Sequence, residues 1–168
     1  MSIADAVANA SRYLTEHPDE ARYRDTAAVA RLVDGLLVEV TSGDGARLQT
    51  DMPRGIGGGA SAPSPGWVLR AAAASCVASL VAIRAAALGH SLSSVSVSVD
   101  SESDDRGILG LDPTIPAGPL TTRIEVTVGV QGQPPGDLEG LVRWAVDHCP
   151  VSDAIARAVP VEVVTKRA

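Results

Sequence analysis

The chain has 168 residues, of which 45% are hydrophobic and 20% charged, a composition typical of one globular domain. Its formal net charge of −6 argues against nucleic-acid binding, because phosphate contacts depend on an excess of Lys and Arg. Aromatic residues make up only 2%, so we expect a core of Val, Ala, Leu and Ile in which helices approach closely.

The N-terminal residues lack the continuous apolar run of an export signal, since Asp5 and Arg12 interrupt them. The longest uncharged helical stretch, residues 71–83, is well short of the roughly 20 residues that cross a bilayer. Without an export signal, the two cysteines, Cys76 and Cys149, favour a reducing compartment. We therefore expect a cytoplasmic protein without a membrane partner.

The chain begins with a short helix and continues with strands. Ser2 to Asp5 forms a capping-box pattern, and the helix that follows should end before His17. Strands are predicted at 28–32 and 36–41 around an Asp-Gly turn, and a third at 47–50. Residues 53–65 are a Gly- and Pro-rich loop, which lacks the Gly-Lys-Ser/Thr of a phosphate-binding loop.

A long helix is predicted from Pro65 to about Leu88, apolar nearly all round and therefore central and buried. Helical spacing predicts that Cys76 points to a packing face. The residues on that face are Leu69, Ala72, Cys76, Leu80, Ile83 and Ala87.

Two alternating strands follow, at 94–99 and 120–130, separated by an excursion over 100–119 that is a candidate lid or interface loop. A helix starting at Leu138 should carry Cys149 on its apolar face, and a last short strand is predicted over 161–163. The order predicts an α+β fold with a mainly antiparallel sheet. We divide the chain into an N-terminal helical extension, 1–26, and a main domain, 27–168.

Two segments carry a resemblance to a known family. One runs from Pro53-Arg54 and Gly57-Gly58-Gly59 through Pro63-Ser64-Pro65 to Ala74-Ser75-Cys76; the other is Cys149-Pro150-Val151-Ser152. Together they resemble the OsmC/Ohr family of osmotically inducible proteins and organic hydroperoxide reductases. The resemblance covers roughly residues 28–164. It implies an OsmC-like fold, an intertwined homodimer with a long, buried Cys-bearing helix at its centre.

The resemblance also implies thiol-dependent reduction of organic hydroperoxides, as in oxidative stress defence. Cys76 would attack the peroxide and become a sulfenic acid, Cys149 would condense with it to a disulfide, and a dithiol or lipoylated protein would reduce the pair. No cofactor or metal is expected. The chemistry itself requires a thiolate and a nearby second thiol.

Peroxidase members of the family orient the thiolate with a glutamate and an arginine. The glutamate position falls on Gly66 and the arginine position on Val33, so both groups are missing, with Arg31 and Arg54 as substitutes to consider. Residues 52–99 contain three arginines and no acidic residue, a surplus that would lower the Cys76 pKa if an arginine reached the sulfur.

Other interpretations stay open. Free cysteines usually pack as small hydrophobes, so the pair could be inert. His148, next to Cys149, could be a base but should point away along its helix. An alternative function is a non-catalytic OsmC-like dimer that binds a small apolar ligand. A weaker idea is that the N-terminal helix and residues 100–119 form a protein-docking surface.

Overall fold

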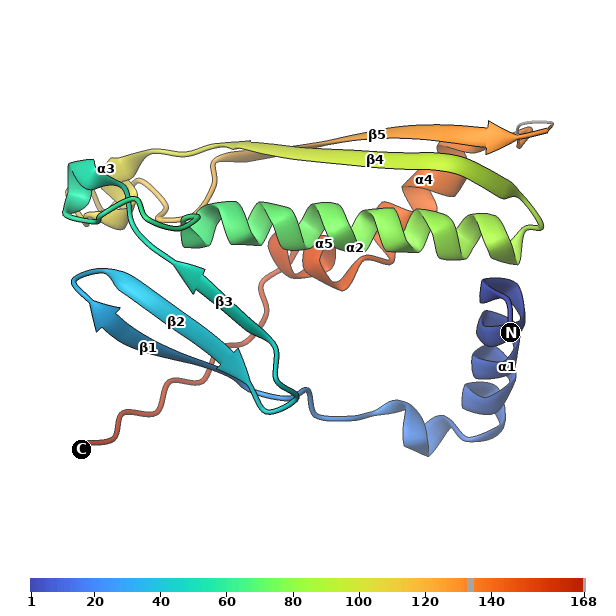
Figure 1. Ribbon diagram of the computed structural model, residues 1–168, viewed down its shortest axis with the longest axis horizontal. Helices are drawn as coiled ribbons and strands as arrows, with labels where there is room; N and C mark the ends of the chain where they lie inside the picture. Colours follow the sequence, from blue (N-terminus) through green and yellow to red (C-terminus); the bar gives the residue numbers. More distant parts are fainter. Residues whose placement is uncertain (133–134, 168) are drawn as a thin grey trace.

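A computed structural model describes residues 1–132 and 135–167 (Figure 1). Its helices and strands, in chain order, are α1 (Ile3–Glu16), β1 (Ala28–Asp34), β2 (Leu37–Ser42), β3 (Arg47–Thr50), α2 (Pro65–Ala87), β4 (Ser91–Glu102), α3 (Asp105–Ile108), β5 (Thr121–Gln131), α4 (Leu138–Asp147) and α5 (Pro150–Ala156). Two 3₁₀ turns, Pro18–Ala21 and Arg54–Ile56, follow α1 and β3. The predicted α+β fold with antiparallel pairing is confirmed.

The long helix α2 is the axis of the fold (Figure 1). Strands β4 and β5 form a two-stranded antiparallel sheet along it, and α1, α4 and α5 also contact it. The pairs Val95–Val128, Val97–Val126 and Val99–Ile124 stand opposite one another in this sheet. Since every second residue of a strand points to the same face, these pairs give the sheet an apolar side. Four of these strands' valines and Ile124 pack against the core on α2.

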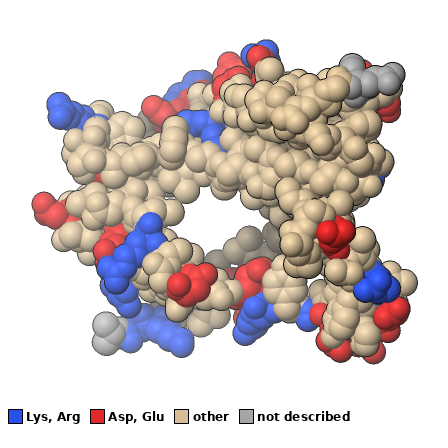
Figure 2. Space-filling view, turned by 45° about the vertical axis from the view of Figure 1, so that its right-hand side comes forward, with Lys and Arg blue, Asp and Glu red and all other residues tan. Residues whose placement is uncertain are grey.

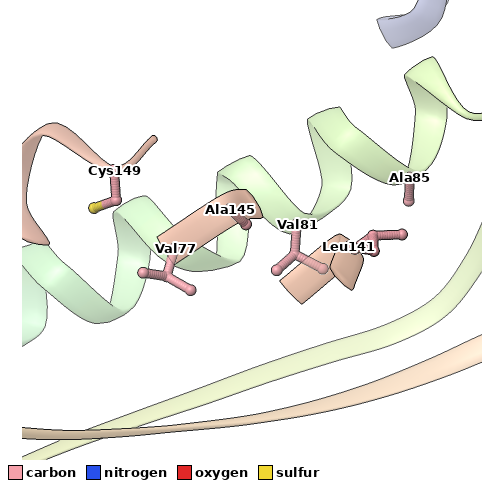
Figure 3. Packing of buried hydrophobic residues seen from close by; sticks show 6 residues of the cluster. All are labelled: Val77, Val81, Ala85, Leu141, Ala145 and Cys149. Carbon is pink, nitrogen blue, oxygen red and sulfur yellow. The ribbon is translucent and has the colours of Figure 1, made fainter. Parts of the chain in front are cut away.

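The core consists of small side chains from α2 and from the segment that begins at α4 (Figure 3). Its buried members are Ala73, Val77, Val81, Ala85, Leu141, Ala145 and Cys149. The four residues from α2 follow the spacing of one helix face, and their small size lets α4 lie close. The predicted packing face was off by one residue, so Cys76 lies at the border of the buried face.

The single chain covers only one face of α2. The expectation of a helix buried all round is therefore not confirmed for one chain, and Trp67, Leu69 and Leu88 near its ends are exposed. By length and composition alone, α2 is a helix that could cross a membrane, a test that the core helix of a soluble protein also passes. The comparison made from the sequence, which found the segment too short to cross a bilayer, had counted only the uncharged residues 71–83.

The three-stranded sheet β1-β2-β3 lies apart from this body, with every residue of β1 exposed (Figure 1). Figure 2 shows an opening through the molecule between the body around α2 and the parts below it. The strand predicted over 161–163 is wrong for the single chain, since residues 157–167 form no strand. A strand exists only where an edge pairs with it, and Val161 and Val163 are each 83% exposed here.

Candidate thiol site and the neighbouring cavity

The fold brings the two cysteines together from positions far apart in the sequence. Cys76 lies in the middle of α2 and is half-buried, whereas Cys149 is 0% exposed. Each sulfur acts on the pKa of the other through a hydrogen bond between the two side chains. No disulfide joins them; both are free.

Cys149 does not lie on the helix that was predicted to carry it. Helix α4 ends at Asp147, and Cys149 is the N-cap of the next helix, α5. Pro150 explains this break, because proline lacks the N–H that would continue the first helix but fits the first turn of the second. The sequence signal for α5 was therefore the Cys-Pro pair itself.

The start of α5 surrounds Cys149 with donors. The backbone N–H of Ser152 donates to the Cys149 sulfur at 3.4 Å. Burial raises the pKa of the Cys149 thiol, but hydrogen bonds from Ser152, Cys76 and the Val151 backbone together outweigh it, so that the pKa lies below its ordinary value. The Ser152 hydroxyl is buried and has no hydrogen-bond partner within normal distance and angle. The well-formed hydrogen bond from Ser152 to the Cys149 sulfur is therefore the one from its backbone N–H.

The surroundings of Cys76, in contrast, raise its pKa above the ordinary value. Burial raises the pKa of the Cys76 thiol, and the hydrogen bond and negative charge of Cys149 raise it further, while the Val151 backbone N–H opposes them. The pair is therefore polarised: the buried sulfur holds negative charge more readily than the accessible one.

The condition for an arginine to lower the Cys76 pKa, that its side chain reaches the sulfur, is not met. Arg54 donates to the Gly59 carbonyl at 3.4 Å, and Arg70 donates to the Ser101 hydroxyl at 3.2 Å. Arg84 lies over the Trp144 ring, 4.7 Å from its centre. Arg31 stands opposite Glu39 in the exposed β1–β2 pairing. None of these groups contributes to the pKa shift of Cys76.

Gly66 and Val33 stand at the positions expected to carry a glutamate and an arginine, so neither position is charged here. Gly66 lies in the first turn of α2, which holds no acidic residue. Val33 lies at the irregularity in β1 between Leu32 and Asp34 and is exposed.

His148 and His17 stack on aromatic rings and not against the sulfurs. The His148 ring stacks on Trp144 with 4.1 Å between ring centres and is exposed, as expected for the neighbour of Cys149 along the chain. His17 stacks on Tyr13 beyond α1. Within residues 1–132 and 135–167, no group of three or more His, Cys, Asp or Glu side chains could hold a metal ion.

A cavity of about 700 Å³ lies at the start of α2, and neither cysteine lines it. Its walls are mainly apolar, with Met52 and Leu69 on one side and Ile108 and Leu109 of the 100–119 excursion on the other, and Ile155 of α5 also contributes. Residues of the 100–119 excursion, the candidate lid or interface loop, thus line a cavity. Sequence reasoning missed the cavity itself, because its walls come from five separate segments.

Asp51 fixes the Gly-rich loop that forms one wall. Its carboxylate is 3% exposed and accepts hydrogen bonds from the backbone N–H groups of Met52 at 2.7 Å, Gly59 at 3.1 Å and Ser61 at 3.0 Å. The Ser61 hydroxyl donates a further one at 2.8 Å. A side chain at Gly58 would overlap the Met52 carbonyl, so the loop closes only with glycine there.

The family described as OsmC-like protein matches residues 57–164. The chain is a member of the OsmC-like family. No curated protein matches it.

Solved structures agree with this assignment. An organic hydroperoxide resistance protein OsmC from Legionella pneumophila, described as a predicted redox protein, is 26% identical, with a TM-score of 0.59 over 80% of this chain and 90% of that one. An organic hydroperoxide resistance protein from Elizabethkingia anophelis is 16% identical, with a TM-score of 0.56 over 80% and 89%. An OsmC-like protein of unknown function from Vibrio cholerae is 11% identical, with a TM-score of 0.66 over 79% and 94%. The last two show the fold alone.

Proposed function

We propose that this protein reduces organic hydroperoxides through a sulfenic acid–disulfide cycle of Cys76 and Cys149, in defence against oxidative stress. The observation that carries the proposal is the hydrogen-bonded pair of thiols, one accessible and one fully buried. Membership of the OsmC-like family and the likeness to the Legionella organic hydroperoxide resistance protein support it.

Accessibility decides which sulfur attacks. Cys76 is partly exposed, so a peroxide can reach it, whereas Cys149 cannot be reached from solvent. Cys149, whose lowered pKa favours its thiolate, accepts a hydrogen bond from Cys76. As the Cys76 sulfur attacks the terminal peroxide oxygen, its proton passes to Cys149, the O–O bond breaks, and the alkoxide leaves and takes a proton from water.

Cys149 completes the cycle. Its sulfur attacks the sulfur of the Cys76 sulfenic acid, an S–S bond forms, and the hydroxyl leaves with the Cys149 proton as water. A dithiol reductant, such as a lipoylated protein, returns two electrons and two protons. Because the two thiols are within hydrogen-bonding reach, the sulfenic acid is trapped before a second peroxide can oxidise it further.

The test is a thiol count on the reduced protein after it meets an organic hydroperoxide. We expect two thiols lost per chain, none lost in Cys76→Ser, and a persistent sulfenic acid in Cys149→Ser, detected by the mass of its carbon-acid adduct. Ser79→Ala, on an exposed position of the same helix, is the control and should behave as the native protein. Unchanged thiols after many equivalents of hydroperoxide would overturn the proposal.

We further propose that the protein works as an intertwined homodimer in the cytoplasm, with residues 1–26 as an extension of the main domain. The uncovered face of α2 and the exposed residues of β1 support this, because a second copy would remove that apolar surface from water. Light scattering should give twice the chain mass of 17.2 kDa. Ser79→Arg on the uncovered face of α2 should yield single chains, and Ser96→Arg on the polar side of β4 should not.

A second candidate function is non-catalytic binding of a small apolar ligand. The cavity of about 700 Å³ favours it, since its volume lies in the range of small-molecule sites, ~300–1,000 Å³. The absence of charge at Gly66 and Val33 agrees with it. Apolar ligand binding by a Cys76→Ser, Cys149→Ser double variant would support this function independently of any thiol chemistry.

A further inference from the structure

We propose that the cavity at the start of α2 binds an amphipathic carboxylate, with Arg70 holding the carboxylate and the apolar walls holding the chain. The inference rests on the second candidate function, ligand binding, and not on the thiol cycle. It starts from the one arginine on a wall that is otherwise mainly apolar.

Arg70 has no carboxylate partner among residues 1–132 and 135–167. Its one side-chain hydrogen bond is to the Ser101 hydroxyl at 3.2 Å, a neutral partner that leaves the guanidinium's charge uncompensated. A guanidinium carries five donors arranged to bind a carboxylate in pairs, so most of its donors stay available to a ligand.

Two nearby carboxylates are already held by other groups. Asp104 lies on the cavity wall but pairs with Arg106 at 2.5 Å, and hydrogen bonds from Arg106 lower the pKa of Asp104 to about 2. Asp51 is held by the backbone of its own loop. Asp105 also lines the cavity, but it is exposed and lies beyond ion-pair distance of Arg70.

Gly66 leaves the space beside Arg70 open. A Cβ atom there would lie 3.8 Å from a terminal nitrogen of Arg70 and 4.0 Å from the Ser64 hydroxyl, both ordinary contacts. A side chain thus fits at this position, one helical turn before Arg70. A glutamate there would satisfy the arginine from within the helix. With glycine in its place, the space next to the guanidinium is free for the carboxylate of a ligand.

The ligand is a monoanion with an apolar body. A single cation, helped by the hydroxyls of Ser101, Ser103 and Thr122 on the wall, matches one carboxylate. Apolar side chains from Met52, Leu69, Ile108 and Leu109 match a hydrocarbon chain. The partial positive charge of the α2 N-terminus, which opens on the same cavity, adds to the attraction.

The test compares decanoate with decanol by calorimetry on the native reduced protein in the absence of peroxide. We expect decanoate to bind about tenfold more tightly, because one charge-assisted pair distinguishes the two. Arg70→Gln should remove that preference, and Arg143→Gln, an exposed arginine on α4, should keep it.

A second pair of variants does not touch Arg70. Gly66→Glu places an internal carboxylate beside it and should remove the preference for decanoate, whereas Gly66→Gln, of the same size, should keep it. Equal binding of decanoate and decanol to the native protein would overturn the role of Arg70 alone. Binding of neither probe would overturn this inference together with the second candidate function, and would leave the thiol cycle standing.

Discussion

The Cys76 side chain hydrogen-bonds to the sulfur of Cys149, and this contact moves the pKa values of the two thiols in opposite directions. The thiol that solvent reaches is the weaker acid, and the buried thiol at the start of α5 is the stronger one. The contact therefore favours negative charge on Cys149 over negative charge on Cys76.

Replacing Cys149 by serine should lower the pKa of Cys76. The hydrogen bond and negative charge of Cys149 both raise that pKa, and the substitution removes the charge while burial and the Val151 N–H remain. The pH midpoint of Cys76 alkylation should therefore shift downwards relative to the native protein. An unchanged or higher midpoint would show that burial alone sets the Cys76 pKa.

The reciprocal change, Cys76→Ala, should raise the pKa of Cys149. It removes one of the hydrogen bonds that lower this pKa, while the raising effect of burial persists. Because Cys149 is buried, its titration is best followed by the ultraviolet absorbance of the thiolate. Ser152→Ala serves as a comparison, since it retains the backbone N–H that donates at 3.4 Å. A Cys149 midpoint that stays or falls in Cys76→Ala would contradict the contact.

The sequence predicted the order of helices and strands up to α4, apart from the short helix α3, because period-two and helical patterns, the Asp-Gly turn and the Ser2–Asp5 cap are local signals. The structure bears out that cap, with both hydrogen bonds of a capping box present. The last strand failed, because pairing with another edge, and not the Val161 and Val163 pattern, decides whether a strand forms.

The sequence indicated which two cysteines form the candidate site, but it did not indicate their pKa values. The spacing of Cys76 and Cys149 in a family pattern indicated the pair. The number of arginines between residues 52 and 99 could not indicate the Cys76 pKa, because none of them contributes to its shift. Where a long side chain points is set by its tertiary partners, here Ser101 for Arg70 and Trp144 for Arg84. The cavity was not predictable because its walls come from five separate segments of the chain.

Asp51→Asn should destabilise the protein in a pH-dependent way. Hydrogen bonds from Ser61, Met52 and Gly59 hold the pKa of Asp51 below its ordinary value of 3.8. A lowered folded-state pKa contributes stability that is present above pH 3.8 and lost as the pH falls through the folded-state pKa. The native protein should thus melt several degrees above Asp51→Asn at neutral pH, and the gap should shrink in acid. A gap independent of pH would mean that the carboxylate charge is not what holds the loop.

The Leu141→Ala variant tests how much the small core between α2 and α4 contributes to the free energy of unfolding. Leu141 is 2% exposed and contacts the buried face of α2, whereas Leu111, in the 100–119 excursion, is 70% exposed. Removing the buried side chain leaves a cavity between two helices, at a cost of about 2–5 kcal/mol in the free energy of unfolding. Leu111→Ala makes the same chemical change on the surface and should alter that free energy by less than about 0.5 kcal/mol. Urea unfolding of both variants measures the difference, and equal midpoints for the two would show that the α2–α4 contact does not hold the chain together.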